Sequence, residues 1–235
     1  DIVDTLTGIL GTGFNPSGSE DPYGVRRAGN GIVRTIIESR QSVDVETLVR
    51  NSFDVYLHTL VLPAPDDLPG RVLDYLRGRV AQYFKEKQLL GEFSPMENLP
   101  LKELGSVPER MQALEAARGD EALPALADSH RRIQNITKGL PEAASLPDDL
   151  LVSEPEEVQL RDAARAALPV IRAALDQRNY AQAIAVCEGM VPAITTFFDR
   201  ILVMANDERV RSARLLLLCH LKYILGQVCD YAKLT

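Results

Sequence analysis

The sequence has 235 residues, a length that suits one or two domains, and 46% of them are apolar, which is enough to fill a core. No run of eighteen apolar residues occurs, so no membrane span is expected. The net charge is −7 and both halves of the chain are acidic, so a role in binding nucleic acid would require a local basic patch.

The first residues and the cysteines bear on the origin and compartment of the chain. Residues 1–6 already have the pattern of a helix interior, and no basic segment precedes an apolar one, so we expect a piece of a longer chain without a signal peptide. Three cysteines, Cys187, Cys219 and Cys229, fall on apolar helix faces. They predict reduced, buried thiols and a cytoplasmic location.

Helical periodicity dominates the first predicted domain, residues 1–90. The expected helices cover residues 1–11, 22–39, 44–62 and 69–90. Asp21 is expected to cap the second helix, with Pro22 at its first position. The third helix is expected to direct these side chains inward: Val45, Leu48, Val49, Phe53, Tyr56, Leu57 and Leu60.

A second domain, residues 108–235, is predicted after an irregular linker at residues 91–107, which glycines and prolines punctuate. Its expected helices cover residues 108–118, 120–139, 155–178, 180–201 and 210–231. Pro192 predicts a kink near residues 188–189. The short connector 205–208 predicts that the last two helices form an antiparallel hairpin. The fold class is therefore all-α, with helical bundle domains.

Catalytic and metal-binding patterns are absent from the sequence. His58, His130 and His220 have no metal-ligand spacing to one another, and Gly11-Thr12-Gly13 follows a helical pattern where a phosphate-binding loop would follow a strand. No pattern suits the activation of an amino acid by ATP. We therefore expect no catalytic residue, no metal and no cofactor in this chain.

Two stretches resemble a known family, the bacterial glycyl-tRNA synthetase β subunit. The first contains Asp4-Thr5-Leu6 and Gly11-Thr12-Gly13, followed by the run from Pro16 to Ala28, which is similar to P-T-G-S-K-D-P-F-A-L-R-R-A. Glu20 and Gly24 depart from that run, where the family has lysine and alanine.

The second stretch, Val191 to Leu218, resembles F-F-D-x-V-x-V-M-x-x-D followed by R-x-x-R-L near the end of that subunit. The run from His130 to Lys138 is similar to the K-R-x-x-N-I-x-K segment that opens its anticodon-binding domain. Arginyl-tRNA synthetases share this helical domain, so residues 108–235 alone also fit that family.

The resemblance implies the C-terminal part of the β subunit: the end of an HD-like region, then a helical anticodon-binding bundle. It implies a non-catalytic portion that binds tRNA(Gly). A catalytic α subunit or fused α domain would carry ATP, Mg and glycine, and the full protein would be an α2β2 ligase in the cytoplasm.

The same resemblance gives most of the weight to the candidate tRNA-binding residues. Arg131, Asn135 and Lys138 share one helix face, with Arg132 at its edge, and can contact an RNA backbone or base. A solvated helix face is the alternative interpretation. Arg26 and Arg27 are further candidates, and local pairing with Glu20 and Asp21 is their alternative.

Two other groups of residues are given structural roles. Asp199 is expected to form an ion pair with Arg211 and Arg214 between the last two helices, which would explain an arginine on an apolar stripe. The aromatic side chains are assigned to the core, namely Tyr180, Phe197, Phe198 and Tyr231.

Two rival hypotheses remain beside a tRNA-binding synthetase segment. An all-α protein-interaction scaffold without RNA binding would suit the negative charge better. The anticodon-binding end of an arginyl-tRNA synthetase would leave the motif at residues 18–22 without an explanation.

Overall fold

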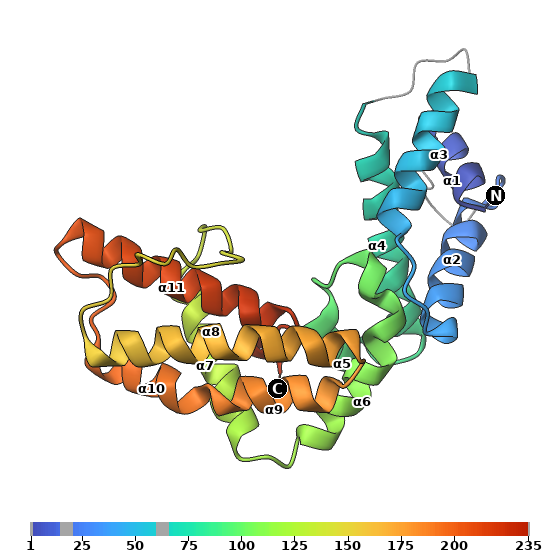
Figure 1. The fold of residues 1–235 in the computed structure, drawn as a ribbon. Coiled ribbons are helices and arrows are strands. Elements are labelled where there is room, and N and C mark those ends of the chain that lie inside the picture. The colour runs from blue at the N-terminus through green and yellow to red at the C-terminus, as the bar shows by residue number, and fades with distance from the viewer. Residues whose placement is uncertain (1, 15–20, 60–65, 235) are drawn as a thin grey trace. The chain divides into compact units, whose positions relative to one another are not determined.

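The computed structural model describes residues 2–14, 21–59 and 66–234. Every regular element in these residues is a helix, which confirms the all-α prediction (Figure 1). The chain forms two compact units. Unit 1 contains Asp1–Phe93 and Leu99–Pro108, and unit 2 contains Ser94–Asn98 and Glu109–Thr235. Two sequence predictions lie outside the described residues. They concern residues 15–20, which carry part of the first family motif, and Leu60, which was expected to face inward.

Among its described residues, unit 1 is a cluster of four long helices with two short ones. The bounds are α1 (Ile2–Gly11), α2 (Val25–Ser39), α3 (Val45–Thr59), α4 (Leu68–Glu86), α5 (Leu90–Phe93) and the 3-10 helix η2 (Leu101–Ser106). Helix α1 packs on α2, α3 and α4, and η2 packs on α2 and α3. Fully buried side chains from each long helix fill the centre, including Leu6, Val25, Val49, Leu68 and Val72.

The start of α2 differs from the prediction. The helix begins at Val25 because Gly24 adopts a left-handed backbone, with φ of 69°, which places Pro22 in the preceding turn. Asp21 still acts as a cap from that turn: its carboxylate accepts the backbone N–H groups of Arg26 and Arg27, each at 3.2 Å.

The predicted inward face of α3 is too wide. Val45, Val49 and Tyr56 are buried, whereas Leu48 and Leu57 are 44% and 48% exposed. With the buried Ser52, the buried positions recur in steps of four, three and four, so they form a narrow stripe on one side of the helix. Leu48 and Leu57 lie at the edges of that stripe, and the prediction that they face inward is wrong.

The segment predicted as an irregular linker, residues 91–107, is largely helical. It contains the end of α5, the 3-10 helix η1 (Ser94–Met96) and η2. The side chains of Phe93, Met96 and Leu101 are buried. The segment is therefore integrated into packed structure, with residues 94–98 belonging to unit 2 and residues 99–108 to unit 1.

Unit 2 is a helical bundle around two central helices. Its elements after η1 are α6 (Val107–Ala117), α7 (Ala122–Ile136), α8 (Pro155–Asp176), α9 (Tyr180–Gly189), α10 (Val191–Arg200), α11 (Glu208–Gly226) and the 3-10 helix η3 (Tyr231–Lys233). Helices α7 and α8 each pack on α9, α10 and α11. Figure 1 shows α8 running alongside α9 and α10 on one side and α11 on the other.

The region predicted as a terminal hairpin is arranged differently. The predicted kink is present as a break at Met190 between α9 and α10, where Pro192 in the first turn of α10 lacks an N–H. Helices α10 and α11 pack chiefly on α7 and α8, so the two are not the close antiparallel pair that the short connector suggested. The central helices occupy the space between them.

The cysteines and the aromatic side chains of unit 2 are buried as predicted. This holds for Cys187, Cys219, Cys229, Tyr180, Phe197, Phe198 and Tyr231.

In the described part of the chain, the stretch Tyr180–Arg200 is long and apolar enough to cross a membrane by length and composition. Half of the most apolar part of this stretch is buried in the bundle, which is typical of a helix that contributes to the core of a helical domain.

Candidate nucleic-acid interface

The outer face of α7 carries the first set of candidate residues. The inner face of this helix packs Leu126, His130 and Ile133 into the bundle. Arg131, Arg132 and Asn135 therefore face outward, and all three side chains are exposed. Lys138 is also exposed and follows the helix end, where Gly139 turns the chain with φ of 81°. We call Arg131, Arg132, Asn135 and Lys138 the α7 ridge.

Arg131 is partly immobilised. One N–H of its guanidinium donates to Asp128 at 2.5 Å, and another donates to the carbonyl of Ala232 at 3.1 Å. Its side chain remains 47% exposed. Because a guanidinium has five N–H donors, the remaining ones are available to an incoming acceptor such as a phosphate.

Arg132 is held by an aromatic ring. Its guanidinium carbon lies 4.1 Å from the centroid of the Phe198 ring, which belongs to α10. A cation over an aromatic face is stabilised by the ring quadrupole, and the contact leaves the edges of the guanidinium open to hydrogen bonding. Phe198 thus supports the ridge from below without being a stacking platform itself.

Asn135 and Lys138 are the unpaired members of the ridge. Within the residues that the structure describes, neither side chain has a hydrogen-bond or ionic partner. Lys138 lies at the C-terminal end of α7, where the helix dipole favours a positive charge. These two side chains can therefore bind a ligand without first breaking an internal bond.

His130 supports the ridge from inside the bundle. Its ring is buried, and Gln134 bridges it to Asp230, with 2.7 Å from the Gln134 amide to the carboxylate. Burial lowers the pKa of His130 to about 4; Asp230 opposes this shift and Lys222 adds to it. His130 is therefore neutral at pH 7 and adds no charge to the ridge.

The second set of candidates, Arg26 and Arg27, begins α2 in unit 1. The Arg27 side chain is 82% exposed and lies 3.7 Å from Asp21, as the alternative of local pairing predicted. Burial raises the pKa of Asp21, but the N–H groups of Arg26 and Arg27 outweigh it, and the net shift is downward. A fixed carboxylate therefore offsets part of the positive charge here.

The predicted ion pair of Asp199 with Arg211 and Arg214 is wrong. Arg214 pairs instead with Glu157 of α8, and both side chains are almost fully buried. Arg211 donates to the carbonyl of Ala205 at 3.0 Å. Arg214 also donates to the carbonyl of Leu202 at 2.9 Å, whereas the Asp199 side chain near the end of α10 is exposed.

Glu157 joins two features that the sequence shows separately. Glu154 and Glu157 form a capping box at the start of α8, in which Glu157 accepts the backbone N–H groups of Ser153 and Glu154. Its other oxygen accepts from Arg214. Burial raises its pKa, whereas the Ser153 N–H, Arg214 and the Glu154 N–H lower it, with a net downward shift.

A further buried arginine was missed by the sequence interpretation. Arg110 of α6 donates to the carbonyls of Gln227 and Val228 at 2.8 and 2.5 Å, and its guanidinium lies 4.9 Å from the Tyr180 ring centroid. It satisfies carbonyls at the end of α11. No local sequence signal identifies such a residue, because its acceptors lie more than a hundred positions away.

For metal binding, the described part of the chain contains no group of three His, Cys, Asp or Glu side chains that could hold an ion.

Comparison with known families gives two matches along the chain. Residues 126–231, which include the α7 ridge, match the family described as the DALR anticodon binding domain. Residues 1–93 match the glycyl-tRNA synthetase beta subunit family. Unit 2 thus contains a helical anticodon-binding domain of the DALR type.

Curated relatives extend the similarity to the whole chain. Glycine–tRNA ligase beta subunits from Aromatoleum aromaticum and Geobacter metallireducens are each 30% identical over 236 residues. The beta subunit from Neisseria meningitidis is 30% identical over 234 residues. The chain belongs to the glycyl-tRNA synthetase β-subunit family. It spans about a third of the length of these relatives, 33–34%, and corresponds to their C-terminal part.

Proposed function

We propose that this chain is the tRNA-binding, non-catalytic part of a glycine–tRNA ligase β subunit, and that the α7 ridge contacts the anticodon region of tRNA(Gly). The observation that carries the proposal is the exposed ridge inside a DALR anticodon-binding domain. Two of its members, Asn135 and Lys138, have no internal partner among the described residues.

The chemistry of the ridge suits folded RNA. Arg131 and Lys138 supply positive charge for phosphates, Arg132 adds a planar donor, and Asn135 can bond a base edge or a ribose hydroxyl. Arg131 and Arg132 are partly ordered before binding by Ala232 and Phe198, so less side-chain entropy is lost on association.

Arg26 and Arg27 are proposed as a weaker, separate RNA contact. Arg27 is highly exposed, but Asp21 lies close to it and reduces the attraction for a phosphate. We expect these residues to contribute less to affinity than the α7 ridge.

The catalytic steps of the ligase are proposed to take place outside this chain. A catalytic α subunit, or an α domain fused to the same chain, would bind ATP, Mg and glycine and carry out aminoacylation. The relatives are named beta subunits, which supports the existence of such a partner. An α2β2 assembly in the cytoplasm completes the proposal.

The test is salt-dependent binding of the whole chain to a tRNA(Gly) transcript, measured by fluorescence anisotropy. Arg131→Glu combined with Lys138→Glu should weaken binding at least tenfold. It should also reduce the slope of log K against log salt concentration by about 1.4–1.8, as expected when two phosphate contacts are lost.

The matched control is Arg77→Glu combined with Arg118→Glu, which changes the net charge equally at two exposed arginines outside the ridge. It should retain most of the affinity. Equal loss in both double variants would show that only overall charge matters. Absence of tRNA binding at low salt would favour the protein-interaction scaffold, and preference for tRNA(Arg) in competition would favour the arginyl-tRNA synthetase hypothesis.

A further inference from the structure

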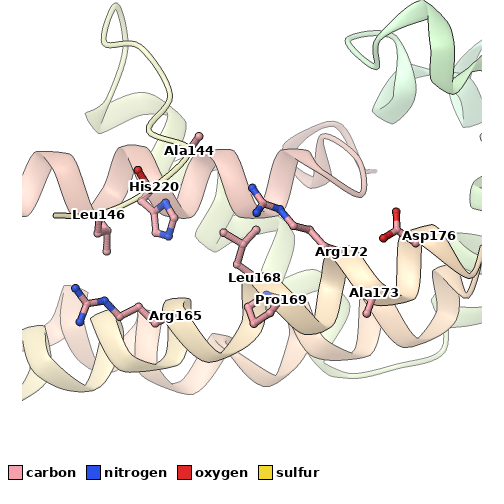
Figure 2. Close-up of a pocket in the computed structure, with 10 residues that line it drawn as sticks. Ala144, Leu146, Arg165, Leu168, Pro169, Arg172, Ala173, Asp176 and His220 are labelled. Carbon is pink, nitrogen blue, oxygen red and sulfur yellow. The ribbon is translucent and has the colours of Figure 1, made fainter. Parts of the chain in front are cut away.

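A groove of about 540 Å3 lies in unit 2, away from the ridge residues described above. Figure 2 shows α8 along one side of it, with His220 of α11 and the loop at residues 144–146 on the other. Its volume falls within the range of roughly 300–1,000 Å3 that is typical of small-ligand sites. Neither the family comparisons nor the sequence motifs assign a role to this groove.

Two arginines from one face of α8 line the groove. Arg165 and Arg172 are seven positions apart, so they lie two helical turns apart on the same side, with Leu168 and Pro169 between them. Arg165 donates to the carbonyl of Pro147, and Arg172 donates to the Tyr223 hydroxyl, each at 3.1 Å. Each internal bond fixes one N–H and leaves the other donors of an exposed guanidinium available.

The opposite wall is held in place by His220. Its Nδ1 lies 2.7 Å from the carbonyl oxygen of Ala143, and the Ala143 N–H donates to the carbonyl of Cys219 at 3.3 Å. Burial lowers the pKa of His220; the Ala143 carbonyl opposes this shift, and Arg172 and Arg165 add to it. The neutral ring therefore donates through Nδ1, and its Nε2 is left as an acceptor.

Pro169 leaves one backbone carbonyl of α8 without its usual donor. Proline has no N–H, so the carbonyl of Arg165, four positions earlier in α8, lacks its usual helical donor. Both residues line the groove. The groove thus combines guanidinium donors for a phosphate with the His220 acceptor for an amino or hydroxyl group, beside the apolar side chain of Leu168.

Carboxylates near the groove do not cancel its positive charge. Asp148 lies 3.6 Å from Arg165 but is fully exposed, so solvent weakens the pair. Asp176 lines the groove beside Arg172 at the far end of α8. Two arginines face one lining carboxylate, in a protein whose overall charge is −7.

We propose that this groove binds one nucleotide of a single-stranded RNA segment, with Arg165 and Arg172 on its phosphate. The inference rests on the proposed tRNA-binding function and adds a contact distinct from the α7 ridge. A single unstacked nucleotide fits because RNA-binding proteins read loops and ends whose bases are free of pairing. A phosphate held by two guanidinium groups is a strong, charge-assisted contact.

The test uses the whole chain and a tRNA(Gly) transcript. Arg165→Ala combined with Arg172→Ala should weaken binding at least fivefold and lower the salt slope by about 0.7–0.9, the value for one phosphate. Arg77→Ala combined with Arg118→Ala removes the same charge from two exposed arginines elsewhere and should change affinity less than twofold. Tyr223→Phe removes the internal bond of Arg172 but keeps its charge, and should bind normally.

Crosslinking gives a second readout that does not depend on these variants. Ser145 lines the groove and is exposed, whereas all three native cysteines are buried, and burial raises the pKa of the Cys187 thiol to about 12. Ser145→Cys can therefore be labelled selectively with a photoreactive group. It should crosslink to a small number of nucleotides in an unpaired part of the tRNA.

The outcomes separate the two proposals. If the wild-type chain binds tRNA but the groove variants keep its affinity and slope, and Ser145→Cys gives no crosslink, the groove proposal is wrong and the proposed function stands. If Tyr223→Phe weakens binding as much as the double alanine variant, the arginines act by packing and the groove proposal is also wrong. If the wild-type chain binds no tRNA, both proposals fail together.

Discussion

The two units use their arginines in different ways. In unit 2, buried or partly buried arginines reach across the bundle: Arg214 of α11 pairs with Glu157 of α8, and Arg110 of α6 donates to carbonyls at residues 227 and 228. In unit 1, Arg34 and Arg77 form local pairs within their own helices, with Glu38 and Asp74. These arginines of unit 2 therefore add long-range polar contacts to its core, whereas Arg34 and Arg77 of unit 1 stabilise only their own helices.

This difference teaches how each unit should respond to mutation. A buried charge that loses its partner is left without compensation, whereas an exposed one is solvated by water. Because the chain contains two units, a single unfolding free energy for the whole is not well defined. Hydrogen exchange measured by mass spectrometry reports on the two units separately and is the appropriate measurement.

The largest effect is expected from Arg214→Ala. It leaves Glu157 buried and unpaired at the start of α8, so unit 2 should lose about 3–5 kcal/mol. Asp199→Ala is the control, since Asp199 is exposed and should change stability by less than about 0.5 kcal/mol. A similar small change in both variants would contradict the assignment of Glu157 as the partner.

The next effect is a loss of stability in unit 2 as the pH falls from 7 to 5. The pKa of His130 in the folded chain is lowered to about 4 from an ordinary value of 6.5. As the pH falls, the unfolded chain therefore binds a proton before the folded chain does, and the free energy of unfolding decreases between pH 6.5 and pH 4. The expected loss at pH 5 is about 2 kcal/mol. His130→Leu should remove most of it, and the remainder reflects the lowered pKa of His220. Equal protection of unit 2 from hydrogen exchange at pH 7 and at pH 5 would contradict the prediction.

A smaller effect is expected from Gly11→Ala in unit 1. The new methyl carbon would lie 2.8 Å from Cζ of the buried Tyr56, an overpacking that costs about 1–3 kcal/mol. The better helix propensity of alanine offsets about 1 kcal/mol of this. Gly8→Ala, three residues earlier, meets nothing within 4 Å and should stabilise α1. The two substitutions should therefore shift exchange in opposite directions, and a shift in the same direction would contradict the close packing of Gly11.

The smallest effect is expected from Arg34→Ala. This arginine lies 3.0 Å from Glu38, one helical turn away, and the two side chains are 68% and 44% exposed. Such pairs contribute about 0.3–0.5 kcal/mol. The loss should diminish in high salt. A loss of stability as large as that caused by Arg214→Ala would contradict the difference proposed between the arginines of the two units.

Much of the helical fold was predictable because its signals are local. Gly11 and Pro155 mark the end of α1 and the start of α8, and Pro192 marks the break before α10. Each acts through its own backbone, so its effect does not depend on distant residues. Part of the α7 ridge was also predictable, since helical spacing places Arg131 and Asn135 on one face, whereas Lys138 lies beyond the end of the helix.

Contacts between distant helices were not predictable in this way. The partner of Arg214 could have been Asp199 or Glu157, and only the packing of α11 on α8 decides between them. The groove was missed for the same reason. Its two arginines share a helix face in the sequence, but His220 completes the wall only because Ala143 is tied to α11. Leu48 and Leu57 show the converse error, in which apolar residues at the edge of a stripe remain exposed.

Unit 2 joins its first and last segments. Asp230 donates its N–H to the carbonyl of Pro95 at 2.6 Å, Lys233 pairs with Glu97, and between these contacts Tyr231 is fully buried. The core of the unit therefore cannot close until residues separated by well over a hundred positions have met. Contacts of such long sequence separation slow folding, and unit 2 should acquire its native protection later than unit 1 as the chain refolds.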